Sequence, residues 1–162
     1  MNFSKSFRNT FLVILLSLIV SACATKKTTT KVEGQMQGDV YTGTDTVKYL
    51  ADGVPDRVFF ATNESILTTK SRDTLRKQAN WLRENSSINV VVEGHADERG
   101  TREYNLALGE RRANAAKDYL ITYGISADRI SVISYGKERP VNSESTPLAW
   151  SQNRRSVTVK VK

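Results

Sequence analysis

Residues 93–120 hold most of the side chains in this chain that could take part in chemistry. His95, the only histidine, stands near Asp97, Glu98 and several arginines, of which Arg112 lies furthest along the segment. Histidine, acid and arginine side chains can cleave a bond, coordinate a metal ion or bind a charged ligand, and each function needs its own arrangement of groups. The number and spacing of these residues therefore decide which of the three functions they can serve.

Cleavage and metal binding both lack the partners that they need. A zinc site takes three or four ligands, but no second histidine is available and Cys23 is the only cysteine. No serine stands with His95 and a third group in a nucleophilic motif. Glu93 or Glu98 with Asp97 cannot straddle a glycosidic bond, because neighbours on one short loop lie on the same side of it. We expect no enzyme activity, no metal and no cofactor, and a loop-organising hydrogen bond for His95.

Asp97 and Arg112 fit the third possibility, a binding site for a charged ligand. Gly94 ends a strand-like run, which places Asp97 in a loop at the end of a strand, where open α/β sheets commonly bind ligands. Asn105 and Arg112 are seven residues apart in a helix-like segment, so they share one face about 10 Å apart, with Leu108 between them. The alternative is that Asp97 and Arg112 form an internal salt bridge that only fixes the loop to the helix, and the residue types alone favour this alternative over a ligand site.

The chain after residue 54 alternates short β-like runs with longer helical ones. Residues 88–93 are continuously apolar, which predicts a central strand, and the last strand alternates valine with polar residues, which indicates that water reaches one face. The order β-α-β-α-β-β predicts an α+β fold, a two-layer sandwich with two helices packed on a small mixed sheet. The expected strands are 57–61, 88–93, 130–135 and 157–161, and the expected helices are 69–85, 103–123 and a short one at 147–153.

The N-terminus indicates that the chain leaves the cytoplasm. Lys5 and Arg8 precede an apolar run, residues 11–20, which is too short for a comfortable membrane span and is typical of a secretory signal. The next residues, 20–23 (VSAC), resemble the bacterial lipobox, in which the cysteine thiol becomes the point of lipid attachment. The sequence therefore predicts a bacterial lipoprotein.

Cys23 is expected to carry the lipid and to begin the mature protein, once residues 1–22 are removed as a lipoprotein signal peptide. As the only cysteine it has no disulfide partner within the chain, and two or three acyl chains would anchor it stably. Ala24 is not an aspartate, which by analogy with enterobacterial sorting favours the outer membrane, with the protein facing the periplasm. The alternative is a plain secretory signal with an incidental cysteine.

Residues 23–53 predict a flexible tether, because they are rich in Thr, Lys and Gly and hold few large apolar side chains. An edge strand near residues 47–50 is the alternative. The compact domain is expected at residues 54–162. A formal charge of +7 could indicate nucleic acid, but in the cell envelope anionic lipid or wall polymer is the expected counter-charge.

Residues 92–116 (VEGHADERGTREYNLALGERRANAA) closely resemble the signature of the OmpA-like peptidoglycan-binding domain, in particular its branch of peptidoglycan-associated lipoproteins. The resemblance continues through residues 130–140 (ISVISYGKERP) and through Asn153, Arg154 and Arg155 before the last strand. It covers most of residues 56–162, and the lipobox and tether also match this branch.

The resemblance implies noncatalytic binding of the peptide stem of peptidoglycan through its diaminopimelate residue. The free end of diaminopimelate carries an ammonium and a carboxylate on one carbon, so its receptor needs an anion and a bidentate cation. Asp97 then accepts the ammonium and Arg112 forks onto the carboxylate. Leu108 packs on the methylene stem, Asn105 bonds the loop or the stem, and Arg99 is a second contact for stem carboxylates.

The loop after the first strand departs from the family pattern. In the family it usually reads Phe-Asp-x-Asp, and its backbone closes one wall of the pocket. Here it reads Phe60-Ala61-Thr62-Asn63, without either acid. The contacts expected from this loop are Phe60 as a wall and the backbone of Ala61 and Thr62.

The resemblance further implies a Tol-Pal system that supports envelope integrity and cell division, with the periplasmic propeller protein TolB as a partner. The alternative function is that the domain mainly docks TolB or other envelope proteins. If Arg112 binds the wall, its replacement by alanine is expected to abolish sedimentation with purified sacculi while thermal stability stays near normal.

Overall fold

The computed structural model describes residues 36–161. The predicted signal peptide at residues 1–22, the lipidated Cys23 and the first part of the predicted tether lie outside the described residues. Among the helices of residues 36–161, none is both long enough and apolar enough to cross a lipid bilayer.

The described elements follow the predicted order, with two short hairpins in front of them. The first hairpin is β1 (Met36–Gln37) with β2 (Val40–Tyr41), and the second is β3 (Tyr49–Ala51) with β4 (Val54–Pro55). The main elements are β5 (Arg57–Phe59), α2 (Thr69–Glu84), β6 (Val90–His95), α3 (Arg102–Thr122), the 3-10 turn η1 (Ala127–Arg129), β7 (Ile130–Gly136), α4 (Pro147–Asn153) and β8 (Arg155–Lys160). The predicted α+β sandwich with helices on a small sheet is confirmed.

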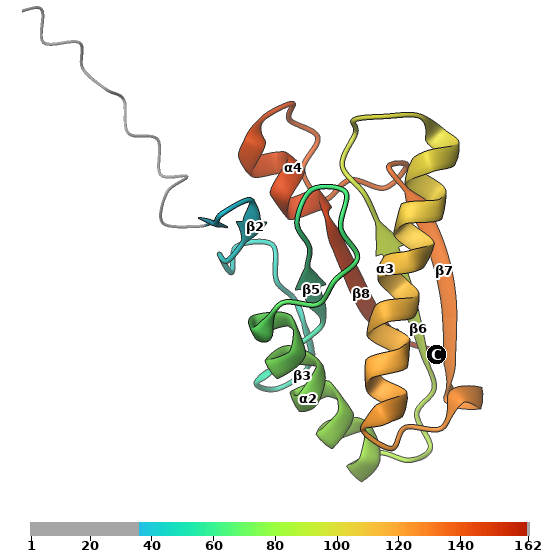
Figure 1. Cartoon of the computed structure of the whole chain (residues 1–162). Helices are drawn as coiled ribbons and strands as arrows, with labels where there is room; N and C mark the ends of the chain where they lie inside the picture. The colour runs from blue at the N-terminus through green and yellow to red at the C-terminus, as the bar shows by residue number, and fades with distance from the viewer. Residues whose placement is uncertain (1–35, 162) are drawn as a thin grey trace, which may run out of the picture. The chain divides into compact units, whose positions relative to one another are not determined.

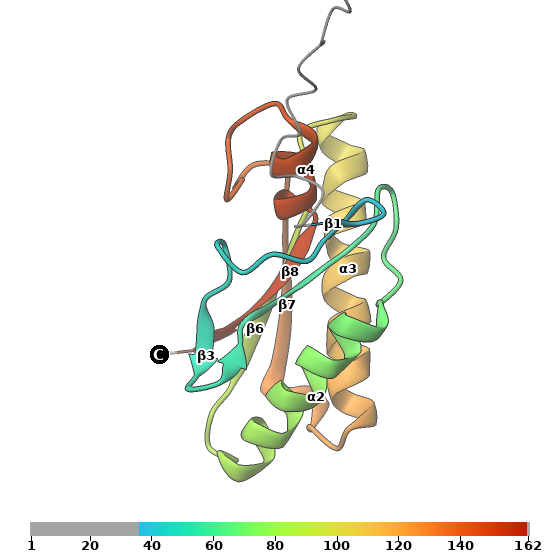
Figure 2. The ribbon, with the colours of Figure 1, turned by 90° about the vertical axis from the view of Figure 1, so that its left-hand side faces the viewer.

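The four main strands form one mixed sheet in the order β5-β8-β6-β7. Strand β6 pairs in parallel with β7 and antiparallel with β8, so it is an inner strand, as its apolar sequence predicted. Helix α3 makes the crossover that a parallel pair requires. Helices α2 and α3 cover one face of the sheet (Figures 1 and 2). The loops that follow β5 and β6 therefore emerge next to the first half of α3.

The core lies between the sheet and the two helices. Its buried side chains come from both layers, among them Val58, Phe60, Leu75, Leu82, Val90, Val92, Ala113, Leu120 and Ile130. Two glycines set how closely α3 approaches the sheet, because a Cβ added at Gly94 of β6 would lie 1.8 Å from the carbonyl oxygen of Gly109 in α3. The helix backbone therefore rests directly on the strand backbone, which fixes the position of the residues on either side of Gly109.

Strand β8 alternates as predicted, but its valines do not face the helices. Ser156 donates a hydrogen bond of 3.0 Å to the carbonyl of Arg112, and Thr158 donates one of 2.8 Å to the side chain of Gln78. Thr158 is 3% exposed, whereas Val159 on the opposite face is 38% exposed. The polar residues can be buried because each meets a polar partner on the helical side.

The prediction of a flexible tether up to residue 53 differs from the structure over residues 36–53. Tyr41 is buried and its ring lies 4.8 Å from the ring of Phe59, and Leu50 is buried as well. Strand β3 pairs with β4 rather than with the edge of the main sheet. A few large apolar side chains, spaced along a polar stretch, are enough to hold this segment on the domain.

The close approach at Gly94 gives a stability prediction. Gly94→Ala is expected to lower the free energy of unfolding by about 3 kcal/mol or more, because its Cβ meets helix backbone that has no room to retreat. Gly53→Ala serves as the control, since Gly53 has a positive φ of 68° but open space around it, and about 1 kcal/mol is expected there. Urea unfolding followed by circular dichroism measures both, and equal losses would contradict the packing argument.

Candidate ligand-binding site

Three segments that are distant in the sequence meet at one end of the sheet. The first is the loop of residues 96–101, which follows β6 and leads into α3, where the side chain of Thr101 caps the helix by accepting from the N–H of Tyr104 at 3.2 Å. The second is the loop of residues 60–68 between β5 and α2. The third is Arg154, directly before β8. Most of the sequence-predicted site residues lie here.

Asp97 is buried in this site and its carboxylate has two arginine partners. It accepts from Arg99 through the backbone N–H at 3.1 Å, Nε at 3.1 Å and Nη2 at 2.7 Å, and from Nη1 of Arg154 at 3.3 Å. Burial by itself raises the pKa of Asp97, but the hydrogen bonds and charges of the two arginines outweigh it, so the pKa lies below its usual value. Asp97 is therefore a carboxylate at neutral pH.

Arg112 is fully buried, with 0% exposure, and its guanidinium joins two segments of backbone. Its Nε donates to the carbonyl of Glu64 at 2.8 Å, its Nη1 to that of His95 at 2.9 Å and its Nη2 to that of Ala61 at 3.0 Å. Burial, and then the nearby charge of Arg154, lowers the pKa of Arg112 to about 10, so it stays charged at neutral pH.

Asp97 and Arg112 thus form no salt bridge with each other, and the alternative that they do is wrong. Among the ion pairs of residues 36–161, those of Asp97 are with Arg99 and Arg154, and Arg112 has none. The role that the alternative gave to this pair, fixing a loop to the helix, is carried out by Arg112 and three backbone carbonyls. Its two remaining N–H groups, one on each terminal nitrogen, are not used in those three bonds.

Sequence reasoning missed two residues of the site, Arg154 and Asp39. Arg154 is buried and donates to the carbonyl of Phe60 at 3.1 Å, to Asp97 and to the carbonyl of Asp39. The carboxylate of Asp39 accepts from the backbone N–H of Thr62 at 2.6 Å and lies 3.9 Å from Nη2 of Arg154. The Asn-Arg-Arg motif before the last strand pointed to Arg154, but Asp39 lies in the segment predicted as tether, where nothing marked it.

Three buried side chains support the site from the side of the core, namely those of Asn105, Leu108 and Phe60. Asn105 donates to the carbonyl of Arg99 at 2.8 Å, so it holds the loop, one of the two roles predicted for it. Leu108 and Phe60 are buried, and Phe60 belongs to the core with its ring centre 5.4 Å from the guanidinium carbon of Arg112. Of the loop backbone expected to contribute, the carbonyl of Ala61 accepts from Arg112 and the N–H of Thr62 donates to the carboxylate of Asp39.

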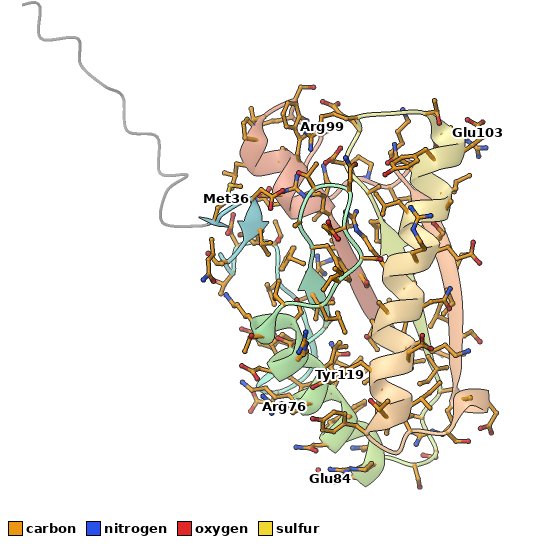
Figure 3. All side chains as sticks on the ribbon, in the orientation of Figure 1. Met36, Arg76, Glu84, Arg99, Glu103 and Tyr119 are labelled. Carbon is orange, nitrogen blue, oxygen red and sulfur yellow. The ribbon has the colours of Figure 1, made fainter. Side chains whose placement is uncertain are left out.

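Arg99 is the accessible part of the site. Its side chain is 43% exposed and its guanidinium carbon lies 4.4 Å from the ring centre of Trp150 in α4. Figure 3 shows Arg99 beside α4, at the same end of the domain as Glu103 in the first turn of α3. Trp150 also donates to Glu98 at 2.8 Å. A ligand that approaches Asp97 therefore meets Arg99 and Trp150 first.

The side chain of His95 does not make the predicted hydrogen bond. It is buried in β6 beside Tyr135, and neither ring nitrogen has a hydrogen-bond partner within the described residues. The loop-organising contact is instead the backbone carbonyl of His95, which accepts from Arg112. Burial, with the positive charges of Arg155 and Arg57, lowers the pKa of the imidazole to about 3. Within residues 36–161, no cluster of three His, Cys, Asp or Glu side chains is placed to hold a metal ion.

The sequence of the chain is similar to known envelope proteins. A family model described as the OmpA family matches residues 59–154. A peptidoglycan-associated lipoprotein of Mesorhizobium japonicum is 43% identical over 153 residues, which are 93% of this chain and 91% of that protein. A peptidoglycan-associated lipoprotein of Brucella melitensis is 44% identical, covering 91% of this chain and 89% of its own. These relatives are named for association with peptidoglycan and not for a reaction.

Solved structures give the same picture. The crystal structure of the peptidoglycan-associated lipoprotein from Burkholderia pseudomallei superposes with a TM-score of 0.64 at 33% identity, and covers 65% of this chain and 90% of that one. The C-terminal domain of MotB from Helicobacter pylori superposes with a TM-score of 0.62, covering 66% of this chain and 84% of that one. At 18% identity, that second likeness concerns the fold alone.

The burial of Arg112 corrects the expectation that its loss leaves stability near normal. Arg112→Ala is expected to lower the free energy of unfolding by about 3 kcal/mol or more, because the carbonyls of His95, Ala61 and Glu64 lose charge-assisted donors and that of His95 is buried. Arg111→Ala is the matched control, since Arg111 is exposed and a change within about 0.5 kcal/mol is expected. Urea unfolding of both variants checks this, and near-native stability of Arg112→Ala would refute the bridging role.

His95 gives a prediction for the pH dependence of stability. Its pKa is about 3 in the folded protein against 6.5 ordinarily, so the unfolded chain binds the proton more readily. The stability contributed by the neutral ring is complete above pH 6.5 and is lost as the pH falls from there toward 3. Between pH 7.5 and 5 the loss is expected to be about 2 kcal/mol.

Because His95 is the only histidine, its ring signals in an NMR titration of the chain are unambiguous. They are expected to show a neutral imidazole down to pH 4.5. A midpoint near pH 6.5 in the folded protein would show that burial and the charges of Arg155 and Arg57 do not lower the pKa of the ring as described.

Proposed function

Because the chain belongs to the OmpA family, we propose that it binds the peptide stem of peptidoglycan noncovalently, through diaminopimelate, without catalysing a reaction. The observation that carries the proposal is the carboxylate of Asp97, held charged between an exposed arginine and a buried one. Relatives that the chain matches over most of their length are named peptidoglycan-associated lipoproteins, which supports the same class of ligand.

The ligand ammonium takes the place of Arg99 on Asp97. The Arg99 side chain is half-exposed, and an ion pair with one exposed partner contributes only about 0–1 kcal/mol, so it exchanges at little cost. Arg154 stays on Asp97 and keeps its position. Arg99, once released, remains beside Trp150 and is free to contact another carboxylate of the stem.

The ligand carboxylate goes to the place that Asp39 now marks. There a carboxylate accepts from the N–H of Thr62 and lies near the guanidinium of Arg154, next to Asp97. Arg112 lies behind this place, fixes the loop through Ala61 and Glu64 and adds its positive charge. When the loop of residues 60–68 moves, the two N–H groups of Arg112 that make no bond to the backbone can donate to the ligand carboxylate. They would then form the predicted bidentate contact.

The role of the protein in the cell follows from two attachments. A lipid is attached at Cys23, and the C-terminal domain binds peptidoglycan. Such a protein tethers the outer membrane to peptidoglycan from its periplasmic side. Many weak bonds act together, because the copies on one membrane face a wall with repeated stems, and each bond can still release. We further propose that the chain works in a Tol-Pal system, with TolB as a partner, in envelope integrity and cell division.

The test compares ligands that differ only in the group recognised. Full chain in detergent is expected to bind soluble muropeptides that carry free diaminopimelate, and roughly tenfold or more weaker binding is expected when lysine replaces it or its carboxyl is amidated. Calorimetry measures the affinities, and sedimentation with intact sacculi checks them on the polymer.

A matched pair of variants locates the site. Asp97→Asn is expected to weaken binding by about tenfold or more, while Asp118→Asn, an equal change on the exposed side of α3, leaves it unchanged. Thermal unfolding confirms that both variants are folded. Equal affinity for the diaminopimelate and lysine ligands would overturn the proposal, and binding of TolB without any binding of muropeptide would favour the docking alternative.

A further inference from the structure

The sheet has a second face that the helices do not cover. Arg57 of β5, Val157 of β8 and Glu93 of β6 form one cross-strand row on it, and Phe59 and Arg155 form the next. In Figure 2, α2 and α3 lie to the right of the sheet and β3 lies to its left. This helix-free face is only partly covered, by the β3–β4 hairpin, by Tyr41 of β2 against Phe59, and by residues 139–141 beside Arg155.

A cavity of about 560 Å³ opens on the helix-free face. Its floor is formed by Arg57, Glu93, Arg155 and Val157, and its sides by Tyr49 and Val141. None of the residues proposed to bind the peptide stem lines it. The inference drawn from this cavity therefore does not rest on the proposed function.

Arg155 in this floor is a buried cation whose donors are poorly used. It is 6% exposed, its Nη2 donates to the carbonyl of Arg139 at 3.2 Å, its Nη1 makes only a 3.5 Å contact with that of Asn153, and its Nε has no partner. Among residues 36–161 it forms no ion pair, whereas neighbouring Arg57 is held at 2.7 Å by both oxygens of Asp56. A buried guanidinium normally has its charge matched.

The residues around the cavity suit a ligand that carries both a negative charge and apolar side chains. Four basic residues line it against two acids, an excess of positive charge. Large apolar side chains stand exposed on the same face, namely Tyr49, Ile133, Val141 and Val159. Grouped exposed apolar side chains with polar groups among them mark surfaces that bind other proteins. A lipid headgroup would meet exposed lysines first, while the unspent donor here lies at the bottom of a cavity.

We propose that the helix-free face binds an acidic segment of a protein partner. A glutamate or aspartate carboxylate of that segment enters the cavity and accepts from Nε and Nη1 of Arg155. Apolar side chains next to the acid rest on Val159 and Ile133. Arg154 and Arg155 are neighbours in the chain, but one serves the loop site around Asp97 and the other serves this face.

The probe is a blocked peptide with glutamate between valine and leucine, titrated into the full chain in detergent. The Nε–H signal of Arg155 in NMR spectra is expected to shift saturably, together with the backbone amides of Ile133 and Val159. The same peptide with glutamine for glutamate is expected to bind roughly tenfold more weakly. Equal binding of the two peptides, or no shift up to roughly 10 mM peptide, would overturn the proposal.

Variants that preserve the buried arginine test the surface without unfolding it. Glu93→Gln removes the acid that shares the cavity and is expected to tighten binding by about threefold. Val159→Glu places a like charge at the rim and is expected to weaken binding by about fivefold or more. Ile66→Glu, an equal change at an exposed position outside the cavity, is the control and is expected to have no effect.

Two other occupants would show different behaviour. If a second copy of the chain covers this face, sedimentation velocity without peptide shows a dimer that Val159→Glu dissociates. If an anionic membrane covers it, the chain floats with phosphatidylglycerol vesicles and Val159→Glu abolishes flotation while Ile66→Glu does not. Either result would replace the acidic protein segment as the occupant.

Discussion

The guanidinium of Arg112 is the interaction on which the loop site depends. Burying a cation away from water is costly unless every donor that loses water gains a partner. Three of the five N–H groups of Arg112 gain one from the carbonyls of His95, Ala61 and Glu64, which belong to the end of one strand and to the loop after another. The loop of residues 60–68 is held to β6 by this side chain, and the places proposed for the charges of the ligand lie between that loop and Asp97.

Strand β8 sends side chains that are neighbours in the sequence to opposite faces of the sheet. Ser156 and Thr158 face the helices and are satisfied there, so the alternating partners Arg155, Val157 and Val159 face the other way. This arrangement leaves apolar side chains half-exposed on one face and buries polar ones on the other. The two faces of the sheet therefore differ: buried polar side chains of β8 face the helices, and arginine and partly exposed valine side chains face the other way.

The sequence was sufficient for the main strands and helices from residue 57 onward and for the region of the site. Helical periodicity located α2 and α3 within a residue of their ends, and Asp97 lies in the predicted loop, but β6 runs through Gly94 to His95 instead of ending at Gly94. It could not supply the partners of Arg112, because backbone carbonyls carry no signature in the sequence. Nor could it show which face of β8 is buried, because alternation states only that two faces differ.

The hairpins of residues 36–55 and the contact of Asp39 with Thr62 escaped prediction for a related reason. The interaction joins positions 23 residues apart, across a stretch whose composition is that of a linker. What holds the segment is the burial of Tyr41 and a few specific hydrogen bonds, such as that of Gln152 to Asp45 at 3.1 Å. Sparse anchors of this kind average out in any window long enough to measure composition.

The position of Asp39 makes the domain sensitive to mechanical force. A pull that arrives along the chain from its N-terminal side acts first on the β1–β2 hairpin, and only afterwards on the sheet that contains β5. Peeling that hairpin away would take the Asp39 carboxylate off Thr62 and Arg154 while the core stays intact. Tension would then vacate the place proposed for the ligand carboxylate, and under that proposal the domain would bind its ligand more tightly under load.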